Sequence, residues 1–280
     1  MKFLLSAILY TSLFIVNNVE ARWQPGVGTT WNYVLQGGSH INVSKEPAQA
    51  IDLDINNDAK INELRKAGKR VICYFSGGTI ETNREDYDEY FKVDGLVRNR
   101  YEDWPKERWL DFRKEGIKPL IKNRMKKAVS KNCDAIEVDN LGAYLHDEVK
   151  SWSDPITKED TIVFAKWLGN TAHSLGISIG LKNVLGIIDS IGDYFDFAIN
   201  ESCILYNECH LYKNFLNQGK AVFAVTYGGV SSHQDALCRN LDGLGISMIV
   251  KDGDDLIQDG TVFDGKKYCG SSFKGTLKKI

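Results

Sequence analysis

The stretch Ala135-Ile136-Glu137-Val138-Asp139 alternates apolar and acidic residues, the pattern of a β-strand whose two faces meet different surroundings. Seven other short runs are rich in β-branched and aromatic residues. Eight strands are therefore predicted, at residues 31–36, 50–54, 71–76, 134–139, 177–182, 195–200, 221–226 and 246–250. Helices are predicted between several of them, at residues 59–67, 117–130, 158–175, 209–218 and 231–241.

Strands that alternate with helices pair in parallel through right-handed crossovers. Eight such strands predict an α/β fold, a (β/α)₈ TIM barrel built as a single domain. The alternative, an open doubly wound sheet, is usually marked by a G-x-G-x-x-G turn after the first strand, which this sequence lacks. Residues 79–116 are expected to form an insertion after the third strand, with Trp104 and Trp109 shaping a rim.

The N-terminus has the pattern of a secretory signal peptide. Lys2 precedes the apolar run 3–16, and small residues at the −3 and −1 positions place the cleavage site after Ala21. A membrane anchor is the alternative, but the run is shorter than the roughly 20 residues that span a bilayer. We therefore expect a signal peptide at residues 1–21, a folded domain at 22–280, and a secreted protein without membrane attachment after cleavage.

The net charge of −2 provides no basic surplus for binding nucleic acid. Six cysteines in a secreted chain favour disulfides, and Cys203 with Cys209 and Cys238 with Cys269 are plausible pairs by their positions. Cys73 lies in an apolar strand, so a buried free thiol is an alternative there. No Cys or His spacing indicates zinc, and we expect a monomer with no metal and no cofactor.

In a barrel, alternate strand residues face the interior. If the apolar residues of each strand face the helices, the inward set is Asp52, Asp54, Tyr74, Ser76, Glu137, Asp139, Ser178, Lys182, Asp196 and Asn200. The same alternation turns Glu201 outward, so we expect the turn after its strand to redirect it.

Carboxylates inside a barrel are costly unless they are paired. A structural ion pair, such as Glu137 with Lys182, explains acids in mid-strand. Asp54, Asp139 and Glu201 lie instead at the carboxyl ends of strands, where the active sites of these barrels are built. Two acids facing one cavity are typical of glycoside hydrolysis. Metal-assisted hydrolysis would prefer histidines or a tighter acidic cluster, and a serine hydrolase would need a G-x-S-x-G elbow.

Several segments resemble glycoside hydrolase family 114, the endo-α-1,4-polygalactosaminidases. They are Val71-Ile72-Cys73-Tyr74-Phe75-Ser76-Gly77-Gly78 with Glu81 and Arg84, Trp109-Leu110-Asp111, Cys133-Asp134 with Glu137-Val138-Asp139-Asn140, Gly180-Leu181-Lys182-Asn183, and Asn200-Glu201-Ser202-Cys203 with Tyr206 and Glu208-Cys209. The likeness is collinear over nearly the whole mature chain. It implies a (β/α)₈ barrel that cleaves internal α-1,4 bonds in galactosamine polymers, with Asp139 and Glu201 as the catalytic carboxylates. We assign Asp139 as nucleophile and Glu201 as acid/base of a retaining mechanism.

The candidate substrate-binding residues are Asp52, Asp54, Tyr74, Glu137, Asn140, Lys182, Asn200 and Tyr227. Asp52 and Asp54 could hold the ammonium group of unacetylated galactosamine. The aromatics Trp31, Tyr74 and Tyr227 could stack on sugar faces or simply pack in the core. The chain departs from the family pattern at Gly142, where an acid is common, and at Thr226, where a glutamate is common. A carbohydrate-binding barrel without turnover and a hydrolase of a related amino-sugar polymer are therefore the alternatives.

Overall fold

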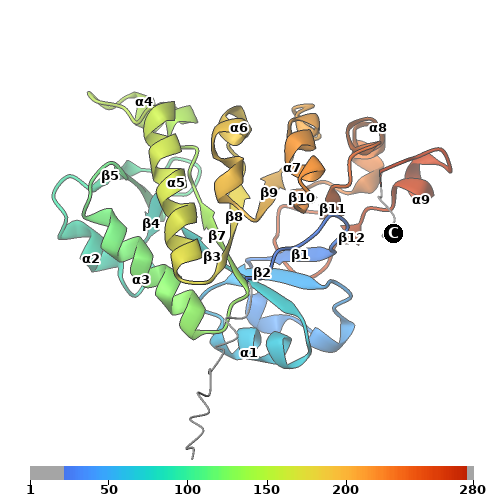
Figure 1. Cartoon of the computed structure of the whole chain (residues 1–280), viewed down its shortest axis with the longest axis horizontal. Coiled ribbons are helices and arrows are strands. Elements are labelled where there is room, and N and C mark those ends of the chain that lie inside the picture. The colour runs from blue at the N-terminus through green and yellow to red at the C-terminus, as the bar shows by residue number, and fades with distance from the viewer. Residues whose placement is uncertain (1–21, 276–280) are drawn as a thin grey trace, which may run out of the picture.

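The structure is a computed structural model, and it describes residues 22–275. The predicted signal peptide, residues 1–21, lies outside the described residues. One curled sheet contains eight parallel strands, hydrogen-bonded in chain order (Figure 1). They are β1 (Trp31–Val34), β2 (Ala50–Asp54), β3 (Arg70–Ser76), β7 (Ala135–Asp139), β8 (Ser178–Lys182), β9 (Phe197–Glu201), β10 (Val222–Thr226) and β11 (Ser247–Val250). All eight predicted strands and the predicted barrel class are confirmed.

The two end strands of the parallel series, β1 and β11, are joined through side chains. Trp31 donates its indole N–H to the carbonyl oxygen of Ser247 over 2.9 Å, and the Ser247 hydroxyl donates to the carbonyl oxygen of Thr29 over 2.7 Å. The edge of β11 pairs instead with the short antiparallel strand β12 (Thr261–Val262). The barrel therefore closes at this seam by side-chain hydrogen bonds and packing.

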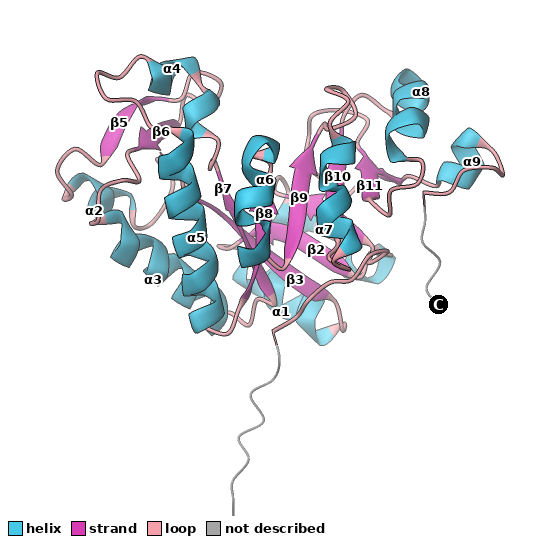
Figure 2. Ribbon diagram, turned by 45° about the horizontal axis from the view of Figure 1, so that its top comes forward, coloured by secondary structure: helices cyan, strands magenta, loops and turns pink. Residues whose placement is uncertain are grey.

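The helices surround the sheet (Figure 2). The five predicted helices are present as α1 (Asp58–Lys66), α3 (Ile117–Ser130), α5 (Lys158–Ser174), α7 (Lys213–Asn217) and α8 (Val230–Leu241), the fourth beginning as a 3₁₀ turn at Cys209–Tyr212. The one-turn helices α4 (Asp147–Lys150) and α6 (Ile188–Ile191) and the short α9 (Gly265–Cys269) were not predicted, because such short segments show no clear periodicity. Helix α5 begins at a capping box, in which Thr157 and Asp160 bond each other's backbone N–H.

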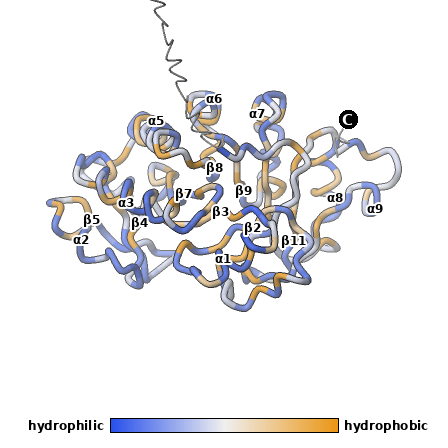
Figure 3. The backbone as a smooth tube through the Cα atoms, turned by 60° about the horizontal axis from the view of Figure 1, so that its bottom comes forward, coloured by the Kyte–Doolittle hydropathy of each residue, from blue (hydrophilic) through white to orange (hydrophobic). Residues whose placement is uncertain are grey.

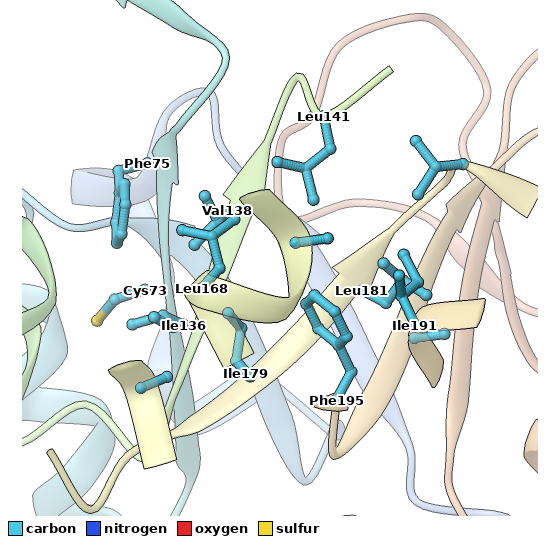
Figure 4. Close-up of a cluster of buried hydrophobic side chains, with 14 of the residues drawn as sticks. Cys73, Phe75, Ile136, Val138, Leu141, Leu168, Ile179, Leu181, Ile191 and Phe195 are labelled. Carbon is cyan, nitrogen blue, oxygen red and sulfur yellow. The ribbon is translucent and has the colours of Figure 1, made fainter. Parts of the chain in front are cut away.

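Two apolar clusters hold the layers together. The larger lies between the sheet and the helices, and Figure 4 shows Ile136, Val138 and Ile179 of β7 and β8 beside Leu168 of α5. Hydrophilic and hydrophobic residues alternate along the surrounding helices, as expected for helices packed on one face (Figure 3). The smaller cluster fills the barrel interior and includes Trp31, Tyr33 and Phe223.

Residues after β3 form a small separate sheet, in the order β4 (Thr79–Glu81), β6 (Glu107–Leu110) and β5 (Val97–Arg100), with helix α2 (Tyr87–Phe91). The insertion was predicted, but its antiparallel sheet was not, because strands of three or four residues give too short a pattern. Trp109 is fully buried in it, which corrects the expectation that this residue shapes a rim. Trp104, by contrast, is 55% exposed.

Three disulfides join Cys73 with Cys133, Cys203 with Cys209, and Cys238 with Cys269. The two pairs suggested from the sequence are confirmed, and the free-thiol alternative for Cys73 is wrong. Within residues 22–275, no helix is both long and apolar enough to span a bilayer.

Candidate active site

Three neighbouring strands, β7, β8 and β9, end at Asp139, Lys182 and Glu201. Because β8 lies between the other two, the Lys182 ammonium stands between the two carboxylates. Its Nζ is 3.5 Å from Asp139 Oδ1 and 3.7 Å from Glu201 Oε2. These two oxygens are therefore at most 7.2 Å apart, the sum of the two distances. The two acids that the sequence singled out thus share one cation.

The inward orientation of Glu201 follows from the regular alternation of β9. Phe197 and Ile199 pack in the interior cluster, whereas Ala198 packs on the helix side. The predicted parity of this strand was therefore wrong, and no redirecting turn is needed for Glu201. The interior of such a barrel is itself a packed core, so apolar residues do not mark the helix side alone.

Two residues of that strand segment follow the corrected parity. Asn200 lies on the helix side, where its Oδ1 accepts a hydrogen bond from the Cys203 N–H over 2.8 Å. Asp196, predicted to point inward, pairs instead with His173 at 2.9 Å and with Arg22 at 3.3 Å. Neither residue is among those that line the cleft described below.

Asp139 is held by the turn that follows β7. The Asn140 N–H donates to Asp139 Oδ1 over 2.7 Å, and the Tyr74 hydroxyl lies 3.4 Å from Oδ2. Asn140 has a φ of +64°, and its side chain donates to the hydroxyls of Ser76 and Thr79 at 2.9 and 3.1 Å. Burial, together with the charge of Asp139, raises the pKa of Tyr74 well above its ordinary value, so this phenol stays protonated.

Glu201 is held from both neighbouring strands. The Tyr227 hydroxyl, just after β10, donates to Glu201 Oε1 over 2.5 Å, and Asn183, just after β8, accepts the Glu201 N–H over 2.9 Å. Burial and the Glu201 charge raise the pKa of Tyr227 above its ordinary value, so this phenol also remains a donor.

A buried polar layer lies beneath the two acids. Lys182 Nζ donates to Glu137 Oε1 over 2.6 Å and to the Tyr33 hydroxyl over 2.8 Å, and both Lys182 and Glu137 are almost completely buried. Burial disfavours the Lys182 ammonium, but the carboxylates of Asp139, Glu137 and Glu201 outweigh it and hold the pKa of Lys182 well above its usual value. Asp52 is fully buried in the same layer.

The acids open into a cleft of about 620 Å³. Of the site residues predicted from the sequence, Asp54, Tyr74, Asp139, Asn140, Lys182 and Glu201 line it. Asp52 and Glu137 lie in the buried polar layer beneath the cleft. Tyr227 contacts the site by its hydrogen bond to Glu201. Trp31 is buried against Phe223, with ring centroids 5.2 Å apart, so it packs in the core rather than facing a ligand.

The insertion supplies two acids, Glu81 and Glu107, that the sequence interpretation did not place in the site, and both line the cleft. Trp104, which was expected to shape a rim, lines the cleft as well. Arg84 pairs with Glu81 and also with Asp54, at 2.8 Å, which partly neutralises both acids. Burial, helped by Glu81 and Asp139, raises the pKa of Glu107 to about 7. The cleft therefore carries three carboxyl groups on the side of the insertion, two of which are paired with Arg84.

The turns at this end of the barrel are unusually tight. Asn140, Asn183, Val184 and Ser202 all have positive φ angles, between +50° and +65°. Val184 is β-branched and lines the cleft, and such a residue in the left-handed region is strained. Within residues 22–275, no group of three or more Cys, His, Asp or Glu side chains is arranged to hold a metal ion.

This geometry can protonate a leaving oxygen with one carboxyl and attack or activate water with the other. The family model for glycoside-hydrolase family GH114 matches residues 15–271. The chain belongs to family GH114. A GH114 member is a glycoside hydrolase, and the resemblance noted in the sequence is thereby confirmed.

Two solved structures are similar to this chain. Ega3 from Aspergillus fumigatus, in complex with galactosamine, is 32% identical over 87% of this chain and 98% of its own, with a TM-score of 0.77. The glycoside hydrolase domain of PelA from Pseudomonas aeruginosa is 14% identical over 83% of this chain and 97% of its own, with a TM-score of 0.60, which shows the shared fold. No curated protein matched the chain.

The two departures from the GH114 pattern leave the acid pair in place. Gly142 lines the cleft, and a Cβ there would meet only Leu145 and Val184 at 3.6 and 3.7 Å, so a side chain would fit. Thr226 is fully buried at the end of β10. Neither departure removes an acid of the pair.

Proposed function

We propose that this GH114 member is a secreted hydrolase that cleaves internal α-1,4 bonds of galactosamine polymers with retention, using Asp139 and Glu201. The observation that carries the proposal is the position of Lys182, 3.5 Å from one acid and 3.7 Å from the other at the floor of one cleft. The limit of 7.2 Å that these distances set for the two oxygens is compatible with the roughly 5–5.5 Å typical of retaining enzymes, and it also overlaps the lower end of the inverting range of about 6.5–9.5 Å.

The contacts of Asp139 are compatible with its assigned role as nucleophile, and the assignment of Glu201 as acid/base rests on the family resemblance. Asp139 receives the Asn140 N–H, the Tyr74 hydroxyl and the Lys182 ammonium, which suit a carboxylate nucleophile. It attacks the anomeric carbon, while Glu201 gives a proton to the departing glycosidic oxygen, leaving a glycosyl ester on Asp139. Glu201 then takes a proton from water, whose oxygen attacks the anomeric carbon and releases Asp139.

The acidic lining of the cleft supports an amino-sugar substrate. Glu81, Glu107 and Asp54 surround the catalytic pair on the side of the insertion, and carboxylates hold ammonium groups by charge-assisted hydrogen bonds. The relative Ega3 was solved with galactosamine, which supports the same substrate class. Three disulfides fit a protein of an oxidising compartment and support secretion.

The test is release of reducing ends from a partly deacetylated galactosamine polymer. We expect turnover by the wild type and a loss of at least about 10²-fold in Asp139→Asn and Glu201→Gln. NMR of the first-formed anomer should show retention. Saturable polymer binding without product would instead favour a carbohydrate-binding barrel, and turnover of another amino-sugar polymer alone would reassign the substrate.

A further inference from the structure

Three carboxyl oxygens in the buried layer have no hydrogen-bond donor among the described residues: Oδ1 and Oδ2 of Asp52 and Oε2 of Glu137. Both side chains are fully buried. Leaving such oxygens unpaired is costly, and native proteins rarely do so. Two ionised carboxylates in one dry site would add mutual repulsion to this cost.

A single proton on one of the two carboxyls would remove both the repulsion and the lack of a hydrogen-bond donor. The Asp52 and Glu137 carboxyls lie close together in this layer, so a proton carried by one of them can form a hydrogen bond to the other. Glu137 already accepts, through Oε1, from Lys182 at 2.6 Å and from the Tyr33 hydroxyl at 3.0 Å, so it is the better anion. Burial, together with the charge of Glu137, raises the pKa of Asp52 well above its ordinary value, which places the proton on Asp52.

We propose that Asp52 is a neutral carboxylic acid that donates a hydrogen bond to Glu137, and that this pair fixes Lys182 between Asp139 and Glu201. Asp52 is thus a positioning residue: it acts through Glu137 and Lys182 and does not line the cleft. The positioning role of Asp52 rests on the proposed function, because it assumes that Asp139 and Glu201 are catalytic. The protonation state of Asp52 does not depend on that function.

The chain of contacts explains why a neutral acid is needed at this point. The titratable groups around Asp52 are Glu137 and Asp139 of β7 and Lys182 of β8, and Tyr33 of β1 completes the layer. An ionised Asp52 would compete with Asp139 and Glu201 for the single ammonium. A neutral Asp52 instead satisfies Glu137 Oε2, so that Glu137 Oε1 holds Nζ in place between the catalytic acids.

Two variants separate the hydrogen bond from the charge. In Asp52→Asn the amide N–H₂ can donate to Glu137 without adding charge, whereas Asp52→Ala removes the donor. We expect Asp52→Ala to lower kcat by about tenfold or more, with KM changed less than about twofold. Asp52→Asn should restore kcat to within about threefold of the wild type and keep the wild-type pH profile. A fall in Asp52→Asn as large as that in Asp52→Ala would overturn the proposal.

Infrared spectroscopy tests the protonation state without a substrate. At pH 8.5, above the pKa of about 7 of Glu107, the wild type should show a protonated-carboxyl band that Asp52→Asn lacks. Asp196→Asn is the matched control, because hydrogen bonds from His173 and Gln24 hold the Asp196 carboxylate ionised, and it should leave the band unchanged. A spectrum identical in wild type and Asp52→Asn would overturn the proposal, even for a protein that cleaves no polymer. An inactive wild type that shows the band would overturn only the proposed function.

Discussion

Tyr227 donates its hydroxyl proton to Glu201 Oε1 over 2.5 Å, so the acid at the end of β9 is held by the residue that follows the next strand. Tyr74 makes the corresponding contact to Asp139 Oδ2, but at 3.4 Å, the long end of hydrogen-bond geometry. The two phenols flank the acid pair, and they hold their partners with unequal strength.

The inequality predicts different effects of removing each hydroxyl. Tyr227→Phe should lower kcat by about 10- to 100-fold, because a hydrogen bond to a charged group contributes roughly 1.5–3 kcal/mol. Tyr74→Phe should lower kcat less than about fivefold, because its contact is long. Steady-state kinetics on the amino-sugar polymer measure both, and a larger loss in Tyr74→Phe would contradict the ranking.

The sequence predicted the inward-facing residues of most strands correctly, because the helix-facing residues of those strands are all apolar. In β2, β3, β7 and β8 the helix-facing residues are all apolar, so the acids and lysine of the opposite parity were placed correctly. In β9 this reasoning failed, because Phe197 and Ile199 fill the barrel interior below Glu201. Alternation gives two sets of residues, and the packing of the whole barrel decides which set faces inward.

The acidic wall could not be predicted from local pattern. Glu107 reaches the cleft only because β6 pairs with β4 and places it beside Thr79, whose hydroxyl donates to it over 2.5 Å. Strands this short have no diagnostic period, and their pairing depends on contacts distant in sequence. The proximity of Asp52 to Glu137 could not be predicted from the sequence either. It depends on the register of β2 and β7, two strands that are separated by β3 in the sheet.

Glu107 predicts a pH-dependent stability. Its pKa is about 7 in the folded protein and roughly 4.3 in an unfolded chain. Between these values the folded protein binds a proton that the unfolded chain has lost, so stability falls as pH rises through this window and then levels off. Glu107→Gln should therefore equal the wild type near pH 4 and exceed it by up to about 3 kcal/mol at pH 8.

Urea unfolding at both pH values measures this difference. The control is Glu89→Gln, an exposed residue of α2 that pairs with Lys92 at 2.5 Å and should show no such change. Equal stability differences for Glu107→Gln at the two pH values would contradict the prediction.

Trp104 is predicted to bind polymer away from the acid pair. It is 55% exposed and lines the cleft from the insertion, and aromatic faces stack on sugars. Trp104→Ala should raise KM for long polymers by about 2- to 12-fold, from a contact of roughly 0.5–1.5 kcal/mol, with kcat unchanged. Phe91→Ala is the control, since Phe91 is 49% exposed in the same insertion but does not line the cleft. An equal KM change in both variants would argue against stacking.

The disulfides should separate stability from activity. Cys73–Cys133 closes a separation of 60 residues and Cys203–Cys209 one of 6, so loop entropy assigns them about 4 and about 2 kcal/mol. The shorter bridge begins two residues after Glu201, whose orientation depends on the turn at Ser202, with a φ of +65°. Cys203→Ala/Cys209→Ala should therefore lower kcat more than Cys73→Ala/Cys133→Ala does. Removing the Cys73–Cys133 bridge should instead lower the free energy of unfolding more. Denaturant unfolding and steady-state kinetics on both double variants test this prediction. A single variant with the larger loss of both kcat and unfolding free energy would refute it.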